Sequence, residues 1–104
     1  MVSGTPFRLY KLNTHQGGHQ VPLIVSKGSG LSDGGGIRRQ YQHVTDLLPT
    51  ILDLVGVEMA TSKGGRPVPA PAGASFTASM GDVSAASTHP EQYYEQMGLS
   101  LIHI

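Results

Sequence analysis

Lys11 stands six residues before a pair of glycines, Gly17 and Gly18, and a short apolar run at residues 21–25 follows the pair. Glycine has no Cβ, so a glycine pair lets the backbone turn tightly or approach a ligand closely. A lysine beside such a turn can present a point charge to an anion such as phosphate or sulfate. Most lysines are solvated surface residues, so the pattern alone is equally typical of a lysine with no such role.

Two histidines lie close to Lys11. His15 and His19 are four residues apart, a spacing that on a helix could bind a metal ion. The glycine pair between them disfavours a helix, so we interpret them as loop histidines. His15 is near enough to Lys11 to be a candidate for lining a substrate pocket.

His43 and Asp46 suggest a catalytic pair at first sight. Asp46 directly precedes an apolar run with helical spacing, and a carboxylate in that position is a favoured N-cap. We therefore predict that Asp46 caps a helix over residues 47–55 and that His43 orders the chain before it. Pro49 falls in the first turn, where its missing N–H leaves no bond unmade, and Gly56 is expected to end the helix in the left-handed conformation.

Composition limits the size of the core. The chain has 104 residues, enough for one small domain, but only 38% are hydrophobic and there is no tryptophan. Fourteen glycines and seven prolines add to the irregular character. We expect a modest core, more typical of a piece of a larger protein than of a self-sufficient domain.

Charge and cysteine content exclude several classes of function. Seven basic and seven acidic residues give a net charge of zero, which argues against a nucleic-acid partner. The absence of cysteine excludes disulfides and thiolate metal sites. No apolar run approaches the roughly 18 residues of a membrane span, and residues 1–5 do not resemble a signal peptide. The localisation of the protein stays open.

The remaining elements are predicted from short patterns. Residues 7–10 are expected to form a short strand or an extended entry, and the β-branched apolar run at 21–26 has the length of a buried strand. Residues 27–36 read as a flexible loop and 59–90 as a Pro- and Gly-rich connector. A helical turn is predicted over 75–80. A strand over 91–97 would use Tyr93 and Tyr94 for packing rather than for ligand stacking.

Several landmarks follow one another in a fixed order. They are Arg8-Leu9-Tyr10-Lys11, Gly17-Gly18, the run at 21–25, the helix sequence at 43–53, Gly73-x-Ser75-Phe76 and Gln92-Tyr93-Tyr94-Glu95. In this order and at these distances they resemble the late part of an arylsulfatase of the type I sulfatase family, within the alkaline-phosphatase-like superfamily. The resemblance covers residues 7–98.

The resemblance implies an α/β fold. Residues 1–58 would be the late strand–helix part of an alkaline-phosphatase-like sandwich, and 59–90 a connector. Residues 91–98 would begin a small C-terminal antiparallel subdomain, and 99–104 are expected to be a non-native tail because they depart from the family pattern.

The implied activity is hydrolysis of small-molecule sulfate esters. Enzymes of this family use a formylglycine nucleophile and a Ca²⁺ ion, neither of which the chain's own residues are expected to supply. By position, Lys11 matches the family's active-site lysine, which implies a catalytic and substrate-binding contact with a sulfate oxygen. No metal ligand carries over, and the isolated chain is expected to be inactive.

Three departures from the family pattern keep alternatives open. Gln16 stands where glutamate usually precedes the glycine pair, Lys27-Gly28 replaces a Trp-Pro pair, and a His-Arg-containing continuation is missing after Gly98. The alternatives are a phosphonate monoester hydrolase or phosphodiesterase of the same superfamily, or a non-catalytic binding module.

Overall fold

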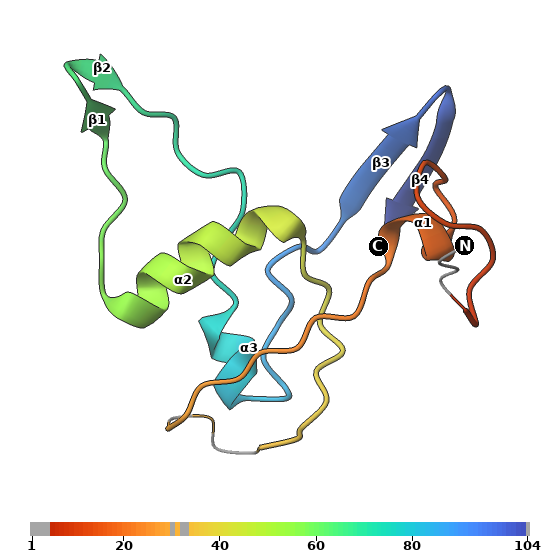
Figure 1. The fold of residues 1–104 in the computed structure, drawn as a ribbon, viewed down its shortest axis with the longest axis horizontal. Helices are drawn as coiled ribbons and strands as arrows, with labels where there is room; N and C mark the ends of the chain where they lie inside the picture. Colours follow the sequence, from red (N-terminus) through yellow and green to blue (C-terminus); the bar gives the residue numbers. More distant parts are fainter. Residues whose placement is uncertain (1–4, 30, 32–33, 104) are drawn as a thin grey trace. The chain divides into compact units, whose positions relative to one another are not determined.

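The computed structural model describes residues 5–29, 31 and 34–103. They form a small mixed α/β structure with two small antiparallel sheets and few helices (Figure 1). The chain divides into two compact units, Met1–Ser26 with Pro90–Ile104, and Lys27–His89. The alternation of helices and strands agrees with the α/β class predicted from the sequence. The predicted domain boundaries stay a prediction.

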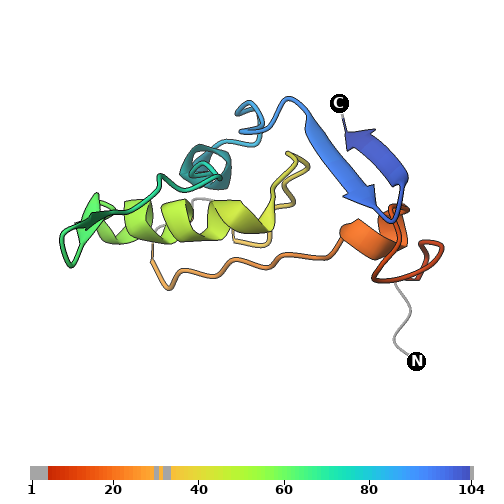
Figure 2. The same ribbon diagram turned by 90° about the horizontal axis from the view of Figure 1, so that it is seen from above.

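The elements follow one another in a simple order. They are α1 (Gln16–His19), the 3₁₀ turn η1 (Val44–Asp46), α2 (Leu47–Val55), β1 (Ser62–Lys63), β2 (Arg66–Pro67), α3 (Thr77–Gly81), β3 (Gln92–Gln96) and β4 (Leu99–His103). The ribbon in Figure 2 shows α2 as the longest helix among them. No helix in the described ranges is long and apolar enough to span a membrane.

Helix α2 has the bounds that the sequence predicts. Pro49 lies in its first turn, where no intrahelical N–H bond is lost. Gly56 adopts φ 67° and ends the helix; its N–H donates to the carbonyl of Asp53 at 3.2 Å, and the N–H of Val57 donates to Leu52 at 3.0 Å. This pair of bonds is the Schellman arrangement, which satisfies carbonyls that the helix end would otherwise leave free. The prediction of a left-handed stop at Gly56 is confirmed.

The interior of the second unit is mainly polar. Phe76 is the one buried hydrophobic residue in the described part of the chain, whereas Asp46, Thr50 and Ser79 are buried polar residues. The apolar side of α2 is largely solvent-exposed, with Ile51 56% exposed. The small apolar core agrees with the composition.

Side chains of an extended segment hold α3 and the chain after it. Arg38 donates to the carbonyls of Ser79 and Met80, at the end of α3. Gln40 donates to the carbonyls of Val83 and Ala85 at 2.8 and 2.9 Å. Alternate side chains of an extended chain point to the same side, so Arg38 and Gln40 contact α3 and the chain after it from one face of the segment. The predicted helical turn near 75–80 is confirmed by α3.

The strand prediction near the C-terminus is confirmed, because β3 pairs with β4 in antiparallel register from Gln92↔His103 to Gln96↔Leu99. Met97 and Gly98, with φ 53° and 78°, form the turn between them. The ring of Tyr94 stacks on that of His19, with centroids 5.0 Å apart. Burial raises the pKa of Tyr94.

Two strand predictions are wrong in this structure. Residues 7–10 are irregular, and the run at 21–26 is extended but unpaired, with Ile24 91% exposed. A strand requires a neighbour for its backbone bonds, and the described residues place none beside this run. Of the predicted loop at 27–36, residues 30, 32 and 33 lie outside the described residues; the others form no helix or strand.

The predicted connector contains a hairpin that the sequence analysis did not anticipate. Strand β1 pairs with β2 through Ser62↔Pro67 and Lys63↔Arg66. Gly64 and Gly65, with φ 57° and 76°, occupy the turn. Positive φ at both central residues is the signature of a type I′ turn, whose twist matches that of paired strands.

Candidate functional site

The loop that carries Lys11 is held by contacts of its own backbone. Lys11 is exposed. It lies between Leu9 and Leu12, which have φ 66° and 74°, a conformation that leucine rarely adopts. The side-chain amide of Asn13 donates to the carbonyl of Tyr10 at 2.9 Å and bridges the turn.

The glycine pair explains how this loop closes. A Cβ on Gly17 would collide with the carbonyls of Arg8 and Leu9, and one on Gly18 would collide with the carbonyl of Asn13. Only glycine allows the chain to approach itself this closely. The pair therefore serves a close approach within the loop, and it lies inside α1 rather than in the loop predicted from the sequence.

The histidines near Lys11 have separate environments. His15 is exposed, extended and directly precedes α1, and its carbonyl accepts from the N–H of Gly18 at 2.7 Å. His19 is the last residue of α1 and stacks on Tyr94. In the residues that the structure describes, no three His, Cys, Asp or Glu side chains gather as metal ligands would. The predicted roles of Lys11 and His15 toward a substrate stay predictions.

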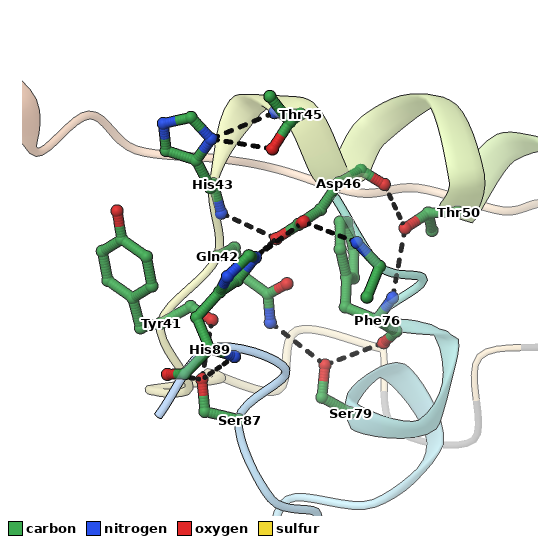
Figure 3. A network of polar contacts seen from close by, with 11 residues as sticks. Tyr41, Gln42, His43, Thr45, Asp46, Thr50, Phe76, Ser79, Ser87 and His89 are labelled. Carbon is green, nitrogen blue, oxygen red and sulfur yellow. Dashed lines mark hydrogen bonds and ion pairs between the residues drawn. The ribbon is translucent and has the colours of Figure 1, made fainter. Parts of the chain in front are cut away.

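The most connected side chain of the second unit is Asp46, which is completely buried (Figure 3). One carboxylate oxygen accepts from the backbone N–H of His43 at 2.8 Å, and the other from that of Ala74 at 3.0 Å. Nε2 of His89 lies 2.7 and 2.8 Å from the two oxygens. A single carboxylate thus joins three segments that are distant in the sequence.

Opposing influences act on this carboxyl. Burial acts most strongly and raises the pKa of Asp46, but the hydrogen bonds from His43, His89 and Ala74 together outweigh it. The pKa of Asp46 is therefore lowered. The carboxylate is held in its charged form because several donors replace the water that burial removes.

The prediction that the side chain of Asp46 caps α2 is wrong. Asp46 makes no side-chain bond to the N-terminus of α2. It is the last residue of η1 and closes a capping box with His43, whose ring accepts from the N–H of Thr45. The structural role predicted for His43 is confirmed, since His43 is the N-cap of η1, which leads directly into α2.

The histidine that contacts Asp46 is His89, which the sequence analysis did not single out. It lies 43 residues away in sequence, and its side chain is 16% exposed. Its ring also meets those of Tyr41 and His43 edge to face, with centroids 5.9 and 6.3 Å apart. The Thr88-His89-Pro90 sequence gives no periodic or spacing signal for such a contact, so only the fold shows it.

Close backbone packing extends the same cluster. The hydroxyl of Thr50 donates to the carbonyl of Asp46 at 2.6 Å and accepts from the N–H of Phe76 at 3.1 Å. A Cβ on Gly73 would lie 2.6 Å from the backbone nitrogen of Asp46. Gly73 therefore allows the segment that carries Ala74 to reach the carboxylate.

A second carboxylate lies further along α2. Asp53 accepts from the hydroxyls of Ser75 and Thr77 at 2.7 and 2.6 Å. These two bonds lower the pKa of Asp53. The carboxylates on and before α2 thus fasten the helix to the chain that leads into α3.

No hydroxyl or thiol of the described residues forms a hydrogen bond with the ring of His89, as the nucleophile of a catalytic triad would. The hydroxyl of Thr88, next to His89, is buried without a hydrogen-bond partner, and that of Ser87 donates to the carbonyls of Tyr41 and His89. The Asp46–His89 pair joins segments of the chain that are distant in sequence, and the role predicted for the exposed Lys11 stays a prediction. No protein-family model matches the chain, and no solved structure matches it.

Proposed function

We propose that the chain is part of a sulfuric ester hydrolase of the arylsulfatase type. The observation that carries the proposal is the exposed Lys11 on a loop closed by Gly17 and Gly18, at the start of the ordered series of arylsulfatase-like landmarks. The close backbone packing of the loop sets the position from which the Lys11 side chain extends. Fixed charge is what stabilises negative charge that develops in a transition state.

The fold that accompanies this proposal is the late strand–helix part of an alkaline-phosphatase-like sandwich. Two features support it. The extended run at 21–25 is apolar and unpaired, and the apolar side of α2 is exposed. A strand needs neighbouring strands and an amphipathic helix needs a surface to cover, so a larger sheet would satisfy both.

In this proposal Lys11 donates a charge-assisted hydrogen bond to a sulfate oxygen. The compact ammonium offers three donors and neutralises charge that moves onto the sulfate and the leaving oxygen. His15, four residues further on and also exposed, is proposed to line the same pocket.

The family resemblance also implies Ca²⁺ and a formylglycine. The described residues do not fit a calcium site, since no three acidic or histidine side chains gather in them. The chain has no Cys- or Ser-x-Pro-x-Arg motif from which formylglycine could form. In this proposal both groups belong to other parts of the longer enzyme.

The test is turnover of an aryl sulfate by the complete enzyme encoded by the full reading frame. Lys11→Ala should lower turnover by about 100- to 1000-fold, because one donor to the developing charge is lost. Lys11→Arg should restore little, since a planar fork does not replace a compact ammonium. Lys27→Ala removes another exposed lysine and is the matched control, with turnover expected to stay unchanged.

Three outcomes contradict the proposal. Normal turnover by Lys11→Ala would make Lys11 an ordinary surface lysine. Faster turnover of an aryl phosphonate monoester than of the aryl sulfate would instead place the enzyme in the phosphonate hydrolase branch. A reading frame with no Cys- or Ser-x-Pro-x-Arg motif would remove the expected nucleophile.

A further inference from the structure

The β1–β2 hairpin stands apart from the rest of its unit. Its strands pair only with each other, and the hairpin contacts no other helix or strand in the described part of the chain (Figure 1). It buries no side chain, because all its residues are exposed. The hairpin therefore adds little to the stability of the fold.

The turn nevertheless has a defined geometry. Gly64 and Gly65 set a type I′ turn, so the strands on both sides are held in one register. In that register Lys63 and Arg66 are directly opposite each other. Side chains of directly opposed residues emerge on the same face, about 5 Å apart at their Cβ atoms.

This arrangement of charges is unfavourable for the hairpin itself. Like charges directly opposite each other destabilise a strand pair. Neither cation forms an ion pair or a hydrogen bond with the described residues, although the chain as a whole is neutral. The turn thus places side by side two cations that have no anionic partner among the described residues.

We propose that Lys63 and Arg66 form a binding site for a tetrahedral oxyanion, sulfate or phosphate, carried by a larger partner molecule. The guanidinium fork can take two oxygens of such a group, and the ammonium can take a third from the other side. A carboxylate has only two oxygens in one plane, and the fork occupies both. The site is independent of the proposed activity, which rests on Lys11.

The experiment measures binding of the 104-residue chain to immobilised dextran sulfate and to immobilised polyphosphate, with neutral dextran as the blank. Lys63→Gln/Arg66→Gln should weaken binding by about tenfold or more, since both charge-assisted contacts are lost. The two polymers separate a sulfate carrier from a phosphate carrier. Polyglutamate tests the preference over carboxylates and should bind more weakly than either.

Two further variants separate a built site from general attraction. Gly64→Ala/Gly65→Ala keeps both cations but disfavours the turn, so binding should fall nearly as far. Lys27→Gln/Arg39→Gln removes two other exposed cations, and binding should change by less than about twofold. Equal losses in the two charge variants, or full binding by the alanine turn variant, would overturn the proposal. Equal binding to polyglutamate would also overturn it.

Discussion

The two sides of helix α2 are built in different ways. On one side, Thr50 and the preceding Asp46 are buried and bonded to the chain at Ala74, Phe76 and His89. On the other side, large apolar side chains such as Leu48 and Ile51 are at least half exposed. The polar side forms hydrogen bonds with the rest of its unit, whereas the large apolar side chains on the other side are not buried by any described residue.

The difference shows what holds residues 27–89 together. Burying a polar group is costly unless it is bonded, but a fully bonded cluster specifies one arrangement of the chain. Asp46, Thr50 and Gly73 are such a cluster, and no large apolar core stands behind them. Stability should therefore respond strongly to changes on the polar side and weakly to changes on the apolar side.

The largest effect is expected for Asp46→Ala. It leaves the N–H groups of His43 and Ala74 and the ring of His89 without their acceptor. The free energy of unfolding should fall by about 3 kcal/mol, several times the worth of an ordinary helix cap. Urea unfolding followed by circular dichroism measures it. Asp53→Ala is the matched control and should cost clearly less, because Asp53 is exposed.

A somewhat smaller effect is expected for Gly73→Ala. The added methyl group would meet the backbone of Thr45 and Asp46, which cannot move without breaking the cluster. We expect the free energy of unfolding to fall by about 2 kcal/mol. Gly28→Ala, where nothing lies within 4 Å, is the control in the same assay. A stability unchanged by Gly73→Ala would show that the two segments do not pack this closely.

The effect of pH is expected to be smaller again. Because the pKa of Asp46 is lowered in the folded state, its contribution is complete above the unfolded value of about 4 and is lost as pH falls through the folded value. Asp53 and Asp82 act in the same direction through their hydroxyl donors. Unfolding measured from pH 6 to 2 should therefore show acid loss, and Asp46→Asn should show less of it. If the stability of the unmutated chain and that of Asp46→Asn fell in parallel with pH, the acid loss would not come from Asp46.

The smallest effect is expected on the apolar side of α2. Ile51→Gln replaces a side chain that is already 56% exposed, so unfolding should change by no more than about 0.5 kcal/mol. The same urea assay applies. A loss comparable to that of Asp46→Ala would mean that this side is covered after all, and the contrast between the two sides would fail.

Local signals in the sequence were sufficient to predict helix α2 and both of its ends. The proline in its first turn and Gly56 at its end act within a few residues, and the structure has both as predicted. The strand over Gln92–Gln96 was predicted from a similarly local pattern. Elements whose limits are set by their own residues are the ones that a single sequence reveals.

Contacts between distant residues could not be predicted in the same way. Asp46 and His89 have no spacing relation, and a carboxylate before a helix is more often a cap than a buried acceptor. The run at 21–26 has the composition of a strand, but composition does not supply the neighbour that a strand needs. Gly17 and Gly18 lie in the short helix α1 although glycine has a low helix propensity, because the chain at Arg8, Leu9 and Asn13 packs too closely against them for a larger residue.

The β1–β2 hairpin also divides the polar cluster in the sequence. Asp46 and Thr50 precede it, whereas Gly73 and His89 follow it, and the hairpin itself contacts neither group's elements. Opening the chain between Gly64 and Gly65 would therefore separate Asp46, the one fully buried acid among the described residues, from its partners at Ala74 and His89. Reassembly of two separately made halves would therefore test the bonds of Asp46 together with those that Arg38, Gln40 and Asp53 make across the same break.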